Sequence, residues 1–178
     1  MEETSPAAQA PSKKWLYIIG GIIVLIALAA FFGGLGRGTG LGSTYFAPGV
    51  DVDRNMDGSV TYESDEGSVT VGQGASMPDN WPSDAPTAYS GAQILYSGST
   101  NPTTGESGSA VAYTVKASVD SVVEYHNSRL KAEGWTITAS ADAGGMRVIT
   151  ATKDTRTFGA YIGSDGQGNT SVTAGIEL

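Results

Sequence analysis

The sequence predicts an α+β domain that follows an N-terminal transmembrane helix. Three observations lead to this prediction: an unbroken apolar run at residues 15–32, several runs in which apolar and polar residues alternate, and one segment at 119–130 with apolar residues at helical spacing. Within residues 92–178 the expected order is two strands, one helix and four strands. We therefore expect an antiparallel sheet that a single helix covers on one face, in a ββαββββ arrangement.

The apolar run reads WLYIIGGIIVLIALAAFF and contains no charged residue. A helix of about 18 residues, rising ~1.5 Å per residue, spans most of the ~30 Å hydrocarbon core of a bilayer. Lys13 and Lys14 directly precede the run, and positive charge at this flank favours a cytoplasmic N-terminus. The sequence thus predicts a cytoplasmic tail at residues 1–14, a single-pass anchor in the lipid bilayer of the cell membrane at 15–32, and an extracytoplasmic remainder.

A cleavable secretory signal peptide is the alternative interpretation of the same run. The triplet Ala27-Leu28-Ala29 matches the small-x-small pattern that would place cleavage after Ala29. However, the run is longer than the usual apolar region of about 7–15 residues, and Glu2 and Glu3 precede it. We favour an anchor that is not cleaved.

Three segments separate the anchor from the domain. Residues 33–49 are rich in glycine, whose backbone entropy favours a flexible linker. Residues 50–72 alternate apolar and polar side chains on both sides of Asp65-Glu66-Gly67, which predicts an acidic β-hairpin. Residues 73–91 contain three prolines, so we expect an extended connector, with Trp81 and Tyr89 as its anchors on the domain.

The domain at residues 92–178 begins with strands at 92–97 and 110–115, the first with Ile94 and Tyr96 on one face. A helix of about 14 residues follows, with Ser118 as its N-cap and Gly134 just past its end. Four strands are expected at 135–140, 146–153, 157–163 and 170–177. In the last two strands apolar residues share one face: Phe158, Ala160, Ile162, Val172, Ala174 and Ile176. The opposite, threonine-rich face should be either solvated or partly covered by the hairpin.

The composition excludes several classes of function. The formal net charge is −8, and residues 50–84 contain eight acidic residues against Arg54 alone, which disfavours nucleic acid as a partner. There is no cysteine, so neither disulfides nor thiolate chemistry is expected. We predict no cofactor.

One segment resembles the first half of a calcium loop. Asp53, Asn55 and Asp57 offer side-chain oxygens at alternate positions, and Gly58 follows. A calcium loop also needs a bidentate glutamate at its twelfth position, where this chain has Ser64. We interpret the segment as an acidic turn, with a calcium site as the alternative.

No catalytic residues are predicted. His126 is the only histidine, and it lies on the apolar side of the expected helix, so we interpret it as a structural residue. Acidic residues are plentiful, but none lies in a recognisable pair for glycoside cleavage.

The segments NWPSDAPTAYSGAQILYSGS, VVEYHNSRLKAEGW and ATKDTRTFGAYI show a family resemblance. The chain resembles membrane-anchored extracytoplasmic proteins of bacteria, including candidate-phylum lineages, whose function is uncharacterised. Such proteins share a WP-x-D-x-P opening and a tyrosine-bearing helix that ends in Gly-Trp, here Gly134-Trp135. The resemblance covers about residues 50–178; it implies this topology and no activity.

We therefore expect a membrane-anchored extracytoplasmic binding or accessory module of the bacterial cell envelope, without enzymatic activity. Its partner would be an envelope protein or glycan. A structural subunit of a surface assembly is the alternative, which would require an exposed apolar patch or an unpaired sheet edge. An envelope hydrolase is a third possibility and would require a deep pocket with convergent polar groups.

Overall fold

The computed structural model describes residues 51–64, 67–100 and 107–178. The predicted tail, anchor and linker lie outside the described residues, as do the hairpin tip at 65–66 and residues 101–106 of the following loop. Within the described ranges, no helix is both long and apolar enough to cross a membrane.

Within the described residues, the strands form one nine-stranded sheet in which each neighbouring pair is antiparallel. The order across the sheet is β1-β2-β3-β4-β5-β9-β8-β7-β6. The strands are β1 (Asp51–Arg54), β2 (Val60–Ser64), β3 (Gly67–Val71), β4 (Gln93–Thr100), β5 (Gly108–Val115), β6 (Thr136–Ala143), β7 (Met146–Lys153), β8 (Arg156–Ser164) and β9 (Thr170–Glu177).

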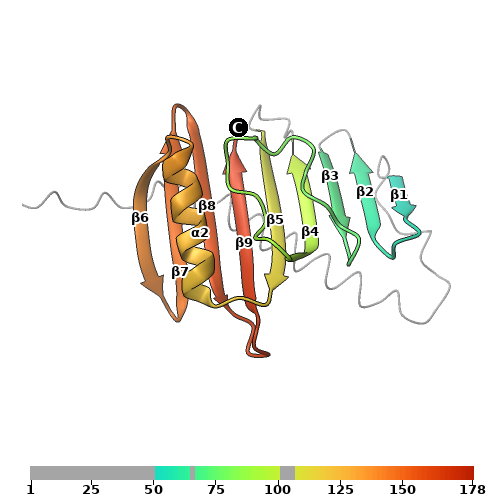
Figure 1. The fold of residues 1–178 in the computed structure, drawn as a ribbon. Coiled ribbons are helices and arrows are strands. Elements are labelled where there is room, and N and C mark those ends of the chain that lie inside the picture. Colours follow the sequence, from blue (N-terminus) through green and yellow to red (C-terminus); the bar gives the residue numbers. More distant parts are fainter. Residues whose placement is uncertain (1–50, 65–66, 101–106) are drawn as a thin grey trace, which may run out of the picture. The chain divides into compact units, whose positions relative to one another are not determined.

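The chain leaves the middle of the sheet at β5 and crosses through the helix α2 (Val119–Ala132) to the far edge at β6 (Figure 1). It then returns strand by strand through β7 and β8 to β9, which pairs with β5. The predicted α+β class and the ββαββββ order within residues 92–178 are confirmed.

Both ends of α2 follow from local sequence. The hydroxyl of Ser118 accepts the backbone N–H of Ser121 at 3.1 Å, as an N-cap does. At the other end Gly134 has φ +79°. The backbone N–H of Gly134 donates to the carbonyl of Lys131, and that of Trp135 to Leu130, which is the Schellman arrangement. Both predicted helix boundaries are confirmed.

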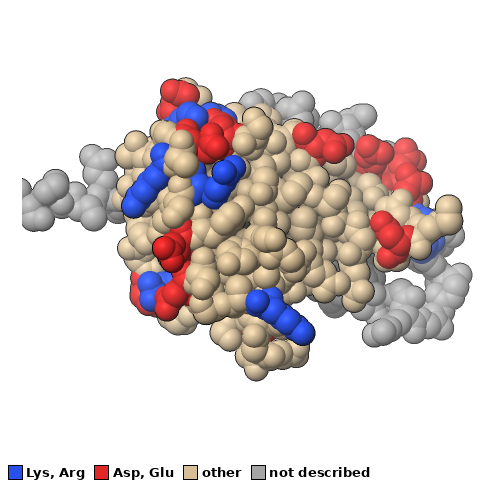
Figure 2. All heavy atoms as spheres, in the orientation of Figure 1, with Lys and Arg blue, Asp and Glu red and all other residues tan. Residues whose placement is uncertain are grey.

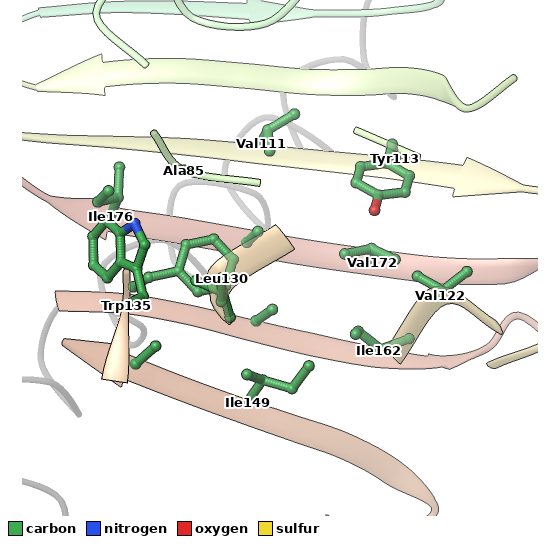
Figure 3. Packing of buried hydrophobic residues seen from close by; sticks show 14 of the residues in the cluster. Ala85, Val111, Tyr113, Val122, Leu130, Trp135, Ile149, Ile162, Val172 and Ile176 are labelled. Carbon is green, nitrogen blue, oxygen red and sulfur yellow. The ribbon is translucent and has the colours of Figure 1, made fainter. Parts of the chain in front are cut away.

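The hydrophobic core lies between α2 and one face of the sheet (Figure 3). The helix contributes Val122 and Leu130, which have no solvent exposure. The six residues predicted to share a face in β8 and β9 are all buried there. Trp135, just after the helix, is 4% exposed and closes one end of the core.

The proline-rich connector at residues 73–91 crosses the same face of the sheet beside α2 (Figure 1). Ala85 and Pro86 are buried, and the Trp81 ring meets Phe158 edge-on with centroids 6.5 Å apart. Tyr89 packs against the core as well. The prediction that Trp81 and Tyr89 anchor the connector is therefore confirmed.

The acidic hairpin extends the sheet edge to edge. Strand β3 pairs with β4 over residues 67–71, so β2 and β3 lie in line with the sheet and do not cover its threonine-rich face. A further strand, β1, pairs with β2 at the outer edge; the sequence analysis did not assign it. Figure 2 shows acidic side chains gathered on the side of these strands, where Asp51, Asp53 and Glu63 are exposed.

One expected face assignment is wrong. Ile94 pairs with Tyr113 whereas Tyr96 pairs with Ala112, because a β-bulge shifts the register between them. Ile94 therefore packs against the core, and Tyr96 lies on the opposite face, where it is 5% exposed. The Tyr96 hydroxyl fills the space over Gly98, since a Cβ there would lie 2.7 Å from it.

Candidate functional site

An open hollow of about 530 Å³ lies where the end of the connector meets α2. The connector contributes Tyr89 and Ser90, and the helix contributes Ser121, Glu124, Tyr125 and Ser128. The four helical residues stand at positions i, i+3, i+4 and i+7, which places them on one stripe of the helix. We call this site the α2 hollow.

The two tyrosines of the α2 hollow hold each other in place. Their ring centroids are 5.2 Å apart with an interplanar angle of 71°, an edge-to-face contact. The Tyr125 hydroxyl also lies 3.2 Å from the hydroxyl of Thr87 in the connector. Rings that are fixed before a ligand arrives lose little conformational entropy when it binds.

A buried hydrogen bond supports the hollow from below. The Tyr113 hydroxyl lies 2.9 Å from Nε2 of His126 and also accepts a hydrogen bond from the backbone of Tyr89. The imidazole tautomer of His126 sets which of these two groups donates, and the other ring nitrogen is Nδ1. That Nδ1 has no hydrogen-bond partner in the described part of the chain.

Burial keeps this pair of side chains neutral. It lowers the pKa of His126 to about 4 and raises the pKa of Tyr113 well above its usual range. His126 is only 1% exposed, as its place on the apolar side of the helix predicted. The pair joins β5, α2 and the connector at the point where the hollow forms.

An ion-pair cluster fixes the connector at a second point, five residues before Tyr89. Asp84 accepts two hydrogen bonds from the Arg156 guanidinium, at 2.8 and 2.7 Å, and one from Lys153 at 2.7 Å. These bonds hold the pKa of Asp84 well below its usual range. The Trp135 indole N–H donates to the Asp84 carbonyl at 2.6 Å, and the guanidinium lies 5.1 Å from the Trp135 ring centroid.

This cluster contains one residue from each of two sequence motifs. Asp84 belongs to the WP-x-D-x-P opening, and Trp135 belongs to the Gly-Trp end of the helix. The structure brings them into direct contact, although they are 51 residues apart. Both motifs therefore position the connector on the sheet.

The chemistry of the α2 hollow suits a neutral polar ligand. Its lining offers three serine hydroxyls, two tyrosine rings and one carboxylate, on Glu124. The serine hydroxyls can both donate and accept hydrogen bonds, and the rings offer apolar faces. No lining residue is cationic, so the site has no positively charged partner for a phosphate or carboxylate.

The candidate calcium ligands form a hydrogen-bonded turn. The Asp57 carboxylate accepts the backbone N–H of Ser59 at 2.9 Å and its hydroxyl at 2.7 Å, which lowers the pKa of Asp57. The Asn55 amide donates to Ser59 and Thr61, and Asp53 is exposed on β1. Across the described ranges no group of three acidic, histidine or cysteine side chains could hold a metal ion. The interpretation of this segment as an acidic turn stays a prediction, and a calcium site at Asp53, Asn55 and Asp57 stays its alternative.

Sequence reasoning did not identify the α2 hollow. The stripe formed by Ser121, Tyr125 and Ser128 was available as a signal, because these polar residues recur at helical spacing beside the apolar stripe. The sequence did not predict that Tyr89 packs against this stripe. That contact depends on how the connector crosses the sheet.

Comparison with known proteins gives one match. A family model described as START domain-like matches residues 96–170, which run from β4 to the start of β9 and include α2. No curated protein matches the chain. No solved structure matches it either. The family match covers less than half of the chain, and it supports a ligand-binding module.

Proposed function

We propose that the chain is a single-pass, membrane-anchored, extracytoplasmic binding module of the bacterial cell envelope, without enzymatic activity, that holds a neutral glycan in the α2 hollow. The observation that carries the proposal is the hollow itself, in which fixed tyrosine rings and serine hydroxyls lie together. The START domain-like match, which includes α2, supports a binding role.

A glycan fits the lining better than a charged ligand does. Sugar rings combine hydroxyl groups with apolar C–H faces, and the hollow offers hydroxyls beside aromatic rings. The hollow is open and shallow, which favours the end or side of a chain over an enclosed small molecule. Cationic partners for an acidic ligand are missing from its lining.

The anchoring part of the proposal is supported by the sequence. Residues 15–32 form the uncharged apolar run, and Lys13 and Lys14 favour a cytoplasmic N-terminus. Protease added to spheroplasts should then digest residues 44–178 and spare the N-terminal tail. Protection of the whole chain would contradict this orientation, and a mature protein beginning at Ala30 would contradict the anchor.

Binding can be tested on the full chain in lipid nanodiscs, with soluble oligomers of N-acetylglucosamine as the probe. We expect Tyr125→Ala to weaken binding by about tenfold or more, equivalent to ~1.4 kcal/mol. Tyr125→Phe keeps the ring and should stay within about threefold of the parent chain, and Ser171→Ala on β9 serves as the distant control. Binding that is absent in the parent would refute a glycan ligand; equal loss in all variants, or in none, would refute the hollow as its site.

The alternative of a structural subunit is favoured by one observation, the exposed sheet edge formed by β6. This edge takes no part in the glycan site.

A further inference from the structure

The two edges of the sheet differ in length and in charge. Strand β1 has four residues, of which three, Asp51, Asp53 and Arg54, are charged and exposed. Strand β6 has eight residues and a single charged one, Asp142. The Asp142 carboxylate lies 3.0 Å from the Arg147 guanidinium of the same chain, so its charge is already paired.

We propose that the β6 edge pairs with β6 of a second copy of this chain, antiparallel and about a two-fold axis, so that two sheets join into one.

The outer side of β6 is free to form such a ladder. In the described part of the chain β6 pairs only with β7, so the backbone groups that point away from β7 have no partner. Native edges are commonly protected by lysine, proline or inward-pointing charge. Beyond its bulge between Ile137 and Ala139, β6 carries none of these. The exposed residues there, Ala139, Ser140 and Ala141, are small enough to let another backbone approach.

Charge and symmetry favour a second copy as the occupant. An antiparallel pair about a two-fold axis at residue 139, 140 or 141 places Asp142 opposite Thr136, Thr138 or Ser140 of the other copy, so that no like charges face each other. Pairing through β1 would instead align a short strand that carries two exposed aspartates. The net charge of −8 opposes association elsewhere on the surface, whereas the β6 edge is neutral once Asp142 is paired.

The helices leave room for this arrangement. Helix α2 contacts β6, β7 and β8, so it is centred over β7. Three strand spacings of ~4.8 Å would separate the two copies of β7 by about 14 Å. Packed helices need only about 8–10 Å between their axes, so the two α2 helices fit side by side on the same face.

Single cysteines can test the pairing, because the chain has no cysteine of its own. Ala139→Cys, Ser140→Cys and Ala141→Cys would be introduced one at a time into the full chain in nanodiscs and oxidised with copper phenanthroline. A disulfide requires Cα atoms about 4.4–6.8 Å apart, so we expect one of the three positions to cross-link at least about fivefold faster than the others. Asp53→Cys on β1 and Ser128→Cys on α2 are matched controls and should cross-link slowly.

Introducing a charge at the interface gives a second measurement. Ala141→Lys should convert the dimer to a monomer in sedimentation equilibrium, and a cooperative melting transition, at a lower temperature than in the dimeric parent, would show that each chain still folds. Cross-linking at equal rates from β6 and from the two controls would overturn the proposal, since association through the membrane anchor alone would give that result. A parent chain that stays monomeric at about 100 µM would overturn it too.

Discussion

At the scale of single residues, His126 couples folding to pH. Burial lowers the pKa of its imidazole from 6.5 to about 4. The unfolded chain therefore binds the proton more tightly, and the stability that depends on the neutral ring is complete above about pH 6.5 and is lost as the pH falls toward 4. We expect the free energy of unfolding to decrease by roughly 3 kcal/mol across this window. Urea denaturation at several pH values should show this slope, and His126→Gln should flatten it; an equally steep slope in the variant would contradict the assignment.

Asp84 gives a second residue-scale prediction, with a matched control in the same chain. Its carboxylate is 25% exposed and meets both Lys153 and Arg156, so Asp84→Asn leaves two cations without their partner. We expect this change to cost about 1–3 kcal/mol, between the values typical of surface and buried pairs. Asp142→Asn breaks a pair whose side chain is 64% exposed and should cost below ~1 kcal/mol.

His126 and Asp84 affect stability in different pH ranges. The pKa of Asp84 is lowered from 3.8, so the stability from its ion pairs is present above that value and is lost only in stronger acid. Chemical denaturation of Asp84→Asn and Asp142→Asn measures the difference between the two ion pairs. Similar unfolding free energies for these two variants would show that Asp84 does not hold the connector.

At the scale of elements, Trp135 joins the end of α2 to the connector and to β8. Its ring is 4% exposed and meets Phe158 with centroids 6.3 Å apart, and its N–H donates to the Asp84 carbonyl. Trp135→Ala should cost ~3–5 kcal/mol, because it removes a buried ring. Trp135→Phe keeps an aromatic ring but loses the hydrogen bond and part of the packing, so we expect a cost between about 1 and 3 kcal/mol. Chemical denaturation measures both, and a cost below ~1 kcal/mol for the alanine variant would contradict the packing.

At the scale of the whole molecule, the core is independent of the acidic strands. Each residue of the buried cluster, and each partly buried residue packed on it, lies between Met77 and Ile176. A fragment from Ser76 to Leu178 should therefore fold cooperatively without lipid or reductant, although it lacks β1, β2 and β3. Its melting temperature should fall by a few degrees, because β4 loses its ladder to β3. A broad, non-cooperative transition would show that the acidic strands are required for folding.

The sequence alone determined the local features of the protein. Alternation of apolar residues located β7, β8 and β9 closely, and helical spacing with Ser118 and Gly134 located α2, because these signals depend on hydrogen bonds and burial within a few residues. The apolar stripe of the helix also predicted the burial of His126. Strand β1 was not foreseen, since it has four residues and a single apolar one, Val52, which is too short an alternation to reveal a strand.

Only the tertiary structure decided how distant segments meet. The bulge in β4 moved Tyr96 to the face opposite Ile94, and the hairpin became an extension of the sheet, because register and edge pairing depend on partners far away in the sequence. The α2 hollow and the Asp84 cluster also depend on contacts between distant residues. Each forms where the connector crosses the sheet and packs against residues more than 30 positions later in the sequence. Local periodicity in the sequence does not predict such contacts, because they form only when distant segments pack against the core.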